Sequence, residues 1–231
     1  QIKRAHLPLY YIITDGNCQS EPKLVNIKLE DIPNFSVTND DGKVDQTPDV
    51  ERVTLEYCDR EEMHLRLENE LPDVDSNGEP VSYYYQWVLD NDTIVGEVGK
   101  SLSRKSVVAG LYTLVVKSSN GSCSSSRDIK VEVHPLPDPI ILPVKENNKF
   151  CTDGSLELAT LNKYKSYKWE ILTDPTITII KDAPDTTLTY PVRDLNLQGA
   201  DIVEVNLWAT DEFGCTNVDV ARWTAELVTP P

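Results

Sequence analysis

The sequence predicts an all-β protein built from tandem β-sandwich domains, and three observations support this prediction. Apolar and polar residues alternate with the period of a strand at 81–89 and at 202–208. A unit of roughly 90–100 residues, the size of one sandwich, recurs along the chain. Asp-Gly at 15–16 and Asn-Gly at 120–121 are typical of tight hairpin turns.

The recurring unit has two complete copies, which we expect to fold as sandwiches at residues 34–136 and 137–231. In each copy a cysteine precedes a strand carrying a tryptophan, Trp87 or Trp169, and a second cysteine follows a late hairpin. Residues 1–33 match only the end of the unit, because "TDGNC" aligns with "SSNGSC" and with "TDEFGC". We therefore expect the chain to open on the C-terminal hairpin of a truncated domain.

The expected strands follow one another in the same order in both copies. The first copy has them at 63–67, 81–89, 110–123 with its hairpin turn, and 129–137. The second has them at 155–159, 164–172, 202–215 with its hairpin turn, and 221–231. Residues 59–71 also resemble a short helix, but Met63, Leu65 and Leu67 recur with period two, which favours a strand. Prolines near residue 33 and within 134–143 predict short, stiff linkers.

Charge and composition exclude several classes of partner. The 231 residues carry a formal net charge of -16, which repels phosphate backbones and anionic lipid surfaces. No apolar run approaches the roughly 18 residues of a membrane span. We therefore expect no nucleic-acid partner and no direct membrane insertion. The opening residues also lack an apolar export segment, so we expect any targeting signal to have been removed or to lie elsewhere.

The five cysteines are expected to form disulfides. No CxxC pair is present, which argues against a zinc ribbon, and wide spacing in an acidic β-rich chain predicts an oxidising compartment. Nearly equal separations, 65 and 64 residues, favour Cys58–Cys123 and Cys151–Cys215, with Cys18 bonded to a partner outside the sequence. The alternative links neighbouring repeats through Cys18–Cys58 and Cys123–Cys151. It stays open, because the two cysteines of one sandwich are expected near opposite ends.

The order of motifs carries a family resemblance. A Tyr-x-Trp strand is followed by a hairpin with "DGNC", "NGSC" or "DEFGC", then by a closing strand and a proline linker. This order of motifs resembles that of the immunoglobulin-like and PKD-like repeats of large Bacteroidetes surface proteins, including gliding-motility adhesins and type IX secretion cargo. The resemblance implies tandem immunoglobulin-like sandwiches at the cell surface. It also implies O-linked glycans on Thr93 and Thr186, in the triplets "DTI" and "DTT".

The segment "DVDSNGEP" is the sharpest candidate for a ligand site. Asp73, Asp75 and Asn77 alternate before a glycine, the pattern that wraps oxygen ligands around calcium, and Glu79 adds a further carboxylate. An EF-hand is excluded, since Tyr84 stands where its bidentate glutamate belongs. The segment instead resembles the acidic loop of cadherin-like and PKD-like domains. Calcium is thus the one cofactor considered, and a solvated acidic turn is the alternative.

Catalysis has little support. The three histidines, His6, His64 and His134, are far apart in sequence, and no GxSxG, HExxH or Walker motif occurs. Trp87 and Trp169 are candidates for sugar stacking, but a sandwich core accounts for them better. We therefore expect no enzyme.

Two functions compete at this point. The first is a stalk or spacer of tandem repeats in a long bacterial cell-surface adhesin or filament. Its expected partners are neighbouring repeats of the same chain and surface glycans or other surface proteins. The second is a carbohydrate- or protein-binding accessory module of a secreted enzyme.

Overall fold

The computed structural model describes residues 8–25, 31–42, 54–75, 78–119, 123–144, 149–173, 175–182, 185–195 and 202–228. In these residues the regular structure is β-strand, apart from one turn of 3-10 helix, η2 (Val192–Asp194). The predicted all-β class of immunoglobulin-like sandwiches is confirmed. No helix of the described chain is long and apolar enough to cross a bilayer.

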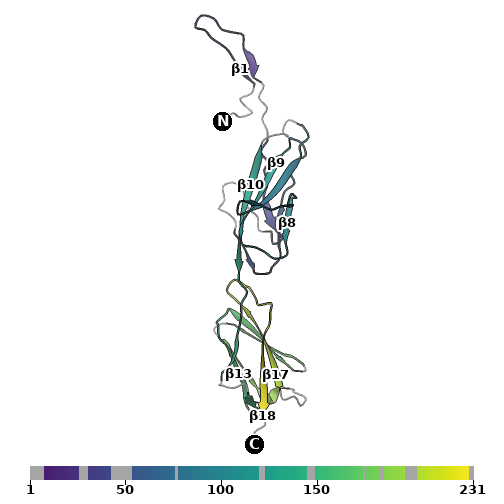
Figure 1. The fold of residues 1–231 in the computed structure, drawn as a ribbon, viewed down its shortest axis with the longest axis vertical. Coiled ribbons are helices and arrows are strands. Elements are labelled where there is room, and N and C mark those ends of the chain that lie inside the picture. The colour runs from purple at the N-terminus through teal and green to yellow at the C-terminus, as the bar shows by residue number, and fades with distance from the viewer. Residues whose placement is uncertain are drawn as a thin grey trace. The chain divides into compact units, whose positions relative to one another are not determined.

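The chain divides into two compact units (Figure 1). The first contains Gln1–Leu55 and Glu62–Glu132, and the second contains Glu56–Glu61 and Val133–Pro231. The short segment Glu56–Glu61 therefore belongs to the second unit, although in sequence it falls inside the first repeat.

The first described element is a two-stranded hairpin. Strands β1 (Leu9–Tyr11) and β2 (Lys23–Val25) pair antiparallel, with Tyr10 opposite Leu24. The ladder extends to a bridge between Thr14 and Gln19, which encloses the turn that carries Cys18.

Two sheets form the first sandwich. The larger has the order β4 (Thr54–Cys58), β10 (Ser124–His134), β9 (Gly110–Ser118), β6 (Tyr83–Leu89) and β7 (Asp92–Thr93). The smaller has the order β3 (Val37–Asn39), β5 (Met63–Leu67) and β8 (Ser101–Arg104). Alternate side chains of each sheet point inward, so the larger sheet buries Trp87 and Leu114 and the smaller one buries Leu65 and Leu102. The helical alternative for 59–71 is thereby excluded, since β5 is a strand.

The second sandwich repeats the same plan. Its larger sheet has the order β12 (Lys149–Cys151), β18 (Ala221–Val228), β17 (Ile202–Thr210), β14 (Ser166–Leu172) and β15 (Ile177–Asp182). Its smaller sheet consists of β11 (Ile141–Pro143), β13 (Ser155–Thr160) and β16 (Thr187–Pro191). Trp169, Leu156, Leu158 and Leu188 lie in one continuous core with Val205.

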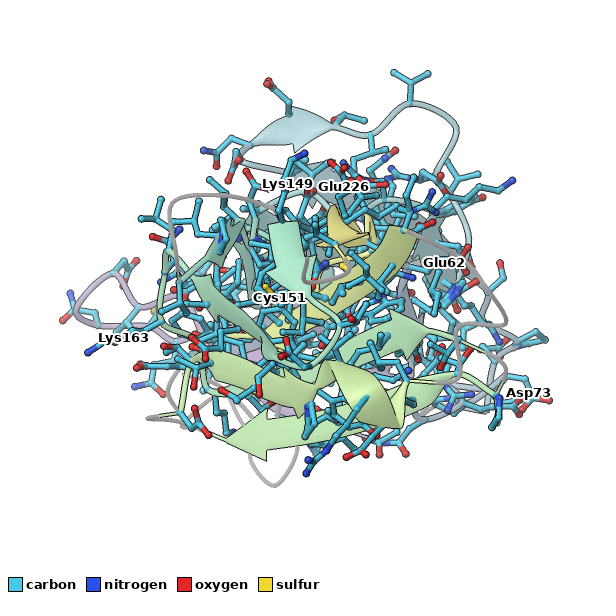
Figure 2. The ribbon with its side chains drawn as sticks, turned by 90° about the horizontal axis from the view of Figure 1, so that it is seen from below. Glu62, Asp73, Lys149, Cys151, Lys163 and Glu226 are labelled. Carbon is cyan, nitrogen blue, oxygen red and sulfur yellow. A yellow bond between two sulfur atoms is a disulfide. The ribbon has the colours of Figure 1, made fainter. Side chains whose placement is uncertain are left out.

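The second strand of this sandwich along the chain, β12, and its last strand, β18, are parallel neighbours. β12 pairs with the last residues of β18, with Lys149 opposite Glu226 and Cys151 opposite Val228. The Lys149 ammonium and the Glu226 carboxylate lie 3.1 Å apart across this pair (Figure 2). Cys151 thus ends its strand at the C-terminal end of β18.

Candidate functional site

The disulfide of the second unit joins Cys58 to Cys215, with 5.5 Å between their Cα atoms and 157 residues of sequence separation. This corrects the predicted pairings. Neither Cys58–Cys123 nor Cys151–Cys215 forms, and Cys18–Cys58 from the alternative scheme is excluded as well. Cys18 and Cys151 carry exposed free thiols, which also rules out Cys123–Cys151. A partner for Cys18 outside the sequence stays a prediction.

The length of the strands explains why the sequence separations of the cysteines predicted the wrong disulfide pairing. Cys123 directly precedes β10, whereas Cys58 lies beside the far end of that strand, where the Asp59 N–H donates to the His134 carbonyl at 2.8 Å. Eleven residues of β10 at about 3.3 Å each place the two cysteines roughly 35 Å apart. Cys151 likewise lies at the C-terminal end of β18, while Cys215 precedes its start. The ~5.5 Å required of bonded Cα atoms is therefore out of reach within either repeat.

An aspartate shapes the turn that presents Cys215. The Asp211 carboxylate accepts the Phe213 N–H at 3.0 Å and the Cys215 N–H at 2.8 Å. The Asp211 N–H donates in return to the Cys215 carbonyl at 2.9 Å. Cys215 is 1% exposed, so the bond to Cys58 is shielded from solvent on this side.

A second turn presents Cys58. The Glu61 carboxylate accepts the Cys58 N–H at 2.7 Å, and the Glu61 N–H donates to the Cys58 carbonyl at 3.2 Å. Next to it, the Arg60 guanidinium pairs with the Asp219 carboxylate at 2.9 Å. Both groups of this ion pair are exposed, so its contribution to stability is small. The disulfide is thus flanked by a polar contact between the same two segments.

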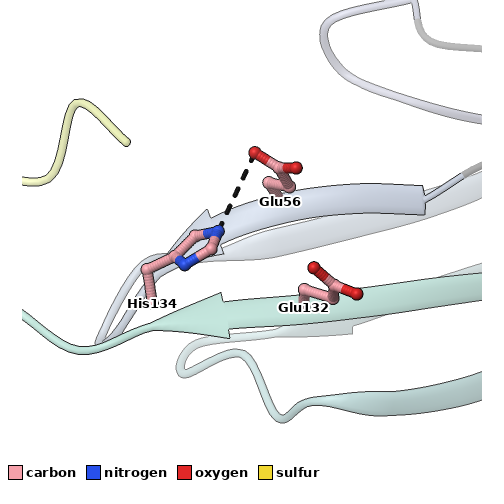
Figure 3. A group of neighbouring side chains, drawn as sticks. All are labelled: Glu56, Glu132 and His134. Carbon is pink, nitrogen blue, oxygen red and sulfur yellow. Dashed lines mark ion pairs between the residues drawn. The ribbon is translucent and has the colours of Figure 1, made fainter. Parts of the chain in front are cut away.

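His134 supports the same region through ring packing. Its imidazole stacks on the Phe213 ring, with 3.7 Å between centroids and 10° between planes. Its Nε2 lies 3.8 Å from a carboxylate oxygen of Glu56 on the neighbouring strand β4 (Figure 3). Glu132, two residues earlier on β10, pairs instead with Lys130. His134 therefore packs as a structural residue of the second unit.

A shallow hollow of about 310 Å³ opens beside the disulfide. Its lining combines the two cysteine-bearing turns, and consists of Cys58, Asp59, Arg60, Glu61, Leu136, Gly214, Thr216 and Val218. The hollow lies within the second unit.

The predicted calcium loop folds as a closed turn. The Asp75 N–H donates to the Glu79 carbonyl at 2.8 Å, and the Asp75 carboxylate accepts the Glu79 N–H at 3.0 Å. Gly78 has φ +83°, which only glycine adopts without strain. The Asp73 carbonyl accepts the Val81 N–H at 2.8 Å and closes the base. Asn77 lies outside the described residues, and calcium binding stays a prediction.

The acidic loop borders a pocket of about 410 Å³ within the first unit. Its polar lining consists of Asp31, Asn34, Asp75 and Tyr83, beside apolar residues that include Leu71. Burial, with smaller contributions from the carboxylates of Asp31 and Asp75, raises the pKa of the Tyr83 hydroxyl. The phenol of Tyr83 therefore stays protonated to a higher pH than that of a free tyrosine.

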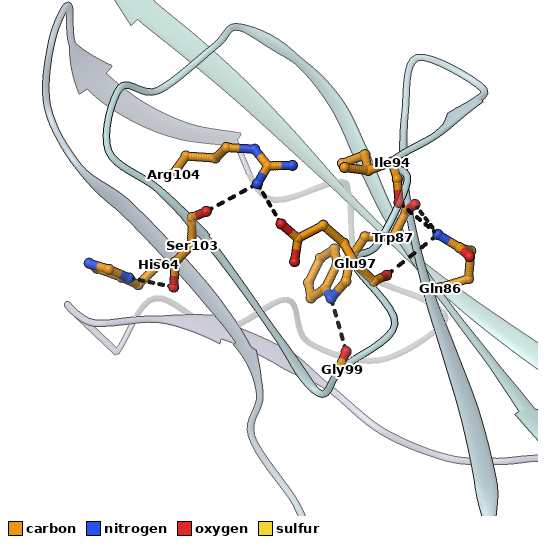
Figure 4. A network of polar contacts seen from close by, with 8 residues as sticks. All are labelled: His64, Gln86, Trp87, Ile94, Glu97, Gly99, Ser103 and Arg104. Carbon is orange, nitrogen blue, oxygen red and sulfur yellow. Dashed lines mark hydrogen bonds and ion pairs between the residues drawn. The ribbon is translucent and has the colours of Figure 1, made fainter.

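The two tryptophans belong to the cores. Trp87 and Trp169 are both fully buried, so neither offers a ring face for sugar stacking. The Trp87 indole N–H donates to the Gly99 carbonyl at 3.2 Å (Figure 4). The amide of Gln86 donates to three backbone carbonyls, of Trp87, Ile94 and Glu97, and Glu97 pairs with Arg104 at 2.8 Å. This network holds the 94–99 loop against the sheet.

The remaining predicted site residues lie at the surface. His64 is exposed and hydrogen-bonds the Ser103 hydroxyl at 2.9 Å, and His6 lies outside the described residues. Thr93 is exposed at the end of the short edge strand β7. Thr186 is partly exposed, directly before β16, and its carbonyl accepts the Thr160 N–H at 3.1 Å. Glycans on these threonines stay a prediction.

Sequence reasoning missed the pairing of Cys58 with Cys215 and the roles of Asp211 and Phe213. One signal for the turn was present: a Thr-Asp pair precedes the cysteine in both "TDGNC" and "TDEFGC". No residue pattern marks the ring stack of Phe213 on His134, because it joins segments that are far apart in sequence.

Comparisons with known proteins give similarities of fold only. No family model and no curated protein sequence matches the chain. Among solved structures, the fibronectin(III)-like modules of Clostridium thermocellum CbhA are 12% identical with a TM-score of 0.36, over 83% of this chain and 94% of that one. Three N-terminal domains of the bacteriophage RB49 outer capsid protein Hoc are 12% identical with a TM-score of 0.41, over 91% and 93%.

A third match is a Ca2+-stabilized adhesin with which an Antarctic bacterium reaches out and binds ice. It is 12% identical with a TM-score of 0.39, over 74% of this chain and 45% of that one. At such identities and scores the likeness says nothing of shared function, so the function is argued from the chain's own residues.

Proposed function

We propose that this chain is a non-catalytic spacer, made of tandem immunoglobulin-like repeats, in an extracellular bacterial surface protein. The observation that carries the proposal is the disulfide Cys58–Cys215. It anchors Glu56–Glu61, a segment of the first repeat in sequence, inside the second unit. A disulfide of this kind can carry load from one repeat to the next, and it supplies no group for catalysis.

The strand pairing of the second sandwich supports a mechanical role. β12, the second strand of this sandwich along the chain, and β18, its last, are parallel neighbours, paired over Lys149–Cys151 and Glu226–Val228. When Cys58–Cys215 is reduced, tension toward the two chain ends passes through the whole second sandwich and pulls these two strands in opposite directions along their length. The backbone hydrogen bonds between them must then break together, whereas a hairpin pulled open at one end loses its bonds one at a time.

The disulfide also supports an extracellular location, since such bonds persist in oxidising compartments. The net charge of -16 keeps a crowded chain soluble and repels anionic lipid. The resemblance of the cysteine-bearing hairpins to Bacteroidetes surface repeats is the reason to place the protein in that group, with type IX secretion as its route. Partners are then neighbouring repeats, with glycans or proteins of other surfaces bound elsewhere on the full protein.

A replacement experiment separates a spacer from a binding module. In the intact protein, residues 34–231 are replaced by an unrelated tandem pair of immunoglobulin-like domains of equal length. A spacer predicts unchanged surface display and unchanged adhesion, because only length and stiffness matter. The matched control deletes the same residues without replacement, and we expect adhesion to fall. Loss of adhesion in the replaced protein, with display intact, would show that these repeats bind the ligand themselves.

A further inference from the structure

Two of the three hairpin cysteines, Cys18 and Cys215, occupy one position of a shared turn. In the turn from Thr14 to Gln19, the Asp15 carboxylate accepts the Cys18 N–H at 2.8 Å, and the Asp15 N–H donates to the Cys18 carbonyl at 3.2 Å. In the turn from Thr210 to Thr216, Asp211 makes the same two contacts with Cys215, at 2.8 and 2.9 Å. Each turn is also closed by a bridge from its threonine to the residue after the cysteine.

A second correspondence links Cys58 with Cys151. Each ends the strand at the same edge of its sheet, β4 beside β10 and β12 beside β18. The next residue donates its N–H to the end of the neighbouring strand, from Asp59 to His134 at 2.8 Å and from Thr152 to Val228 at 3.1 Å.

The turns that follow the two edge cysteines also agree. The N–H three residues on returns to the cysteine carbonyl, from Glu61 to Cys58 at 3.2 Å and from Gly154 to Cys151 at 2.9 Å. Strand position, strand-end contact and following turn thus assign Cys58 and Cys151 to one position of the repeat.

The disulfide Cys58–Cys215 shows that cysteines at the edge position and at the hairpin position bond to each other. Cys58, at the edge position of one repeat, is bonded to Cys215, at the hairpin position of the next repeat along the sequence. Cys151 holds the edge position of that next repeat, with an exposed thiol (Figure 2). The structure therefore contains one completed link and one free edge cysteine built in the same way.

We propose that Cys151 bonds to the hairpin cysteine of a repeat that follows in the same protein, so that each repeat is stapled to the next. The inference rests on the proposed function, because it requires further repeats. Bond formation removes two protons and two electrons from the two thiols. An exchanging disulfide, of an oxidoreductase or of glutathione, accepts them and leaves as two thiols.

The test adds the missing repeat. A second copy of residues 137–231 is placed after Pro231; in the added copy, Val218→Ile marks the hairpin peptide by mass and Cys151→Ser removes the duplicate edge thiol. Residue 218 and Cys215 share one tryptic peptide, because the flanking cleavage sites are Arg193 and Arg222. After folding in a glutathione redox buffer, we expect the Cys151 peptide joined to the marked peptide and the Cys58 peptide joined to the unmarked one.

The matched control carries Cys215→Ser in the added copy only. Its Cys151 should react with N-ethylmaleimide as fully as in the original chain, while Cys58–Cys215 persists. A free Cys151 in the unsubstituted extended chain, or Cys151 bonded to any other cysteine, would overturn the proposal.

The intact protein gives a second readout that does not depend on folding of the added copy. Its thiols are blocked with N-ethylmaleimide before lysis, and its peptides are mapped without reduction. A Cys151 peptide joined to one from beyond Pro231 supports the staple, and a blocked Cys151 contradicts it. If Cys151 is blocked although further repeats follow, only the proposed disulfide of Cys151 is contradicted. Loss of adhesion after domain replacement would instead contradict the spacer function.

Discussion

Single residues fix the geometry of the cysteine-bearing turns. Asp15 and Asp211 each direct a carboxylate to the N–H of the cysteine that follows, at 2.8 Å in both turns. A charged acceptor makes a stronger hydrogen bond than a neutral one, so the aspartate orients the cysteine before any disulfide forms.

Asp15 allows a test of this role by pH. Hydrogen bonds from the N–H groups of Cys18 and then of Asn17 lower the pKa of its carboxyl from 3.8. A lowered folded-state pKa means that the stabilisation is fully present above pH 3.8 and is lost as the pH falls through the folded value. We expect the amide resonances of Cys18 and Asn17 to titrate with a midpoint below 3.8 in NMR spectra.

The control is Asp15→Asn, which keeps an acceptor oxygen and removes the titrating group. In this variant both amide resonances should stay constant across the same pH range. A midpoint at or above 3.8 in the natural chain would contradict the role given to the carboxylate.

At the scale of strands and turns, the sequence predicted the β fold but not the pairing of the cysteines. Period-two alternation predicted the β fold, because a half-buried strand must place every second side chain inward, as Tyr112, Leu114 and Val116 do on β9. The cysteine pairing was not predictable from spacing, because spacing carries no direction. Cys151 and Cys215 are 64 residues apart in sequence, yet lie at opposite ends of β18.

The predicted calcium loop can be tested by thermal unfolding with and without calcium. Because ligand at 100 times its dissociation constant adds about 2.7 kcal/mol, calcium should raise the melting temperature of the chain relative to chelator. Asp75→Asn is expected to abolish this increase, since it removes a ligand charge while keeping an acceptor for the Glu79 N–H. Ser36→Ala, outside the loop, serves as a control and should retain the increase. Identical melting curves of the natural chain in calcium and in chelator would leave the loop as a solvated turn.

At the scale of the whole molecule, the disulfide determines which residues can carry tension. A force applied at the two chain ends passes through the shortest covalent path, which crosses directly from Cys58 to Cys215. The bond bypasses the 156 residues from 59 to 214, and 75 of the 231 remain in the path. Most strands of both sandwiches, including β6, β9, β14 and β17, lie in the bypassed stretch.

This bypass is measurable by pulling single molecules from their termini. At about 3.5 Å per extended residue, the oxidised chain should reach roughly 260 Å at full extension, and the reduced chain roughly 800 Å. The double variant Cys58→Ser, Cys215→Ser should reach the longer value without reductant, whereas Cys151→Ser should keep the shorter one. The shorter limit means that the bypassed strands can unfold under tension only after the bond breaks, so a stapled repeat keeps its length at loads that unravel an unstapled one. Full extension of the oxidised natural chain would show that Cys58–Cys215 does not carry the load.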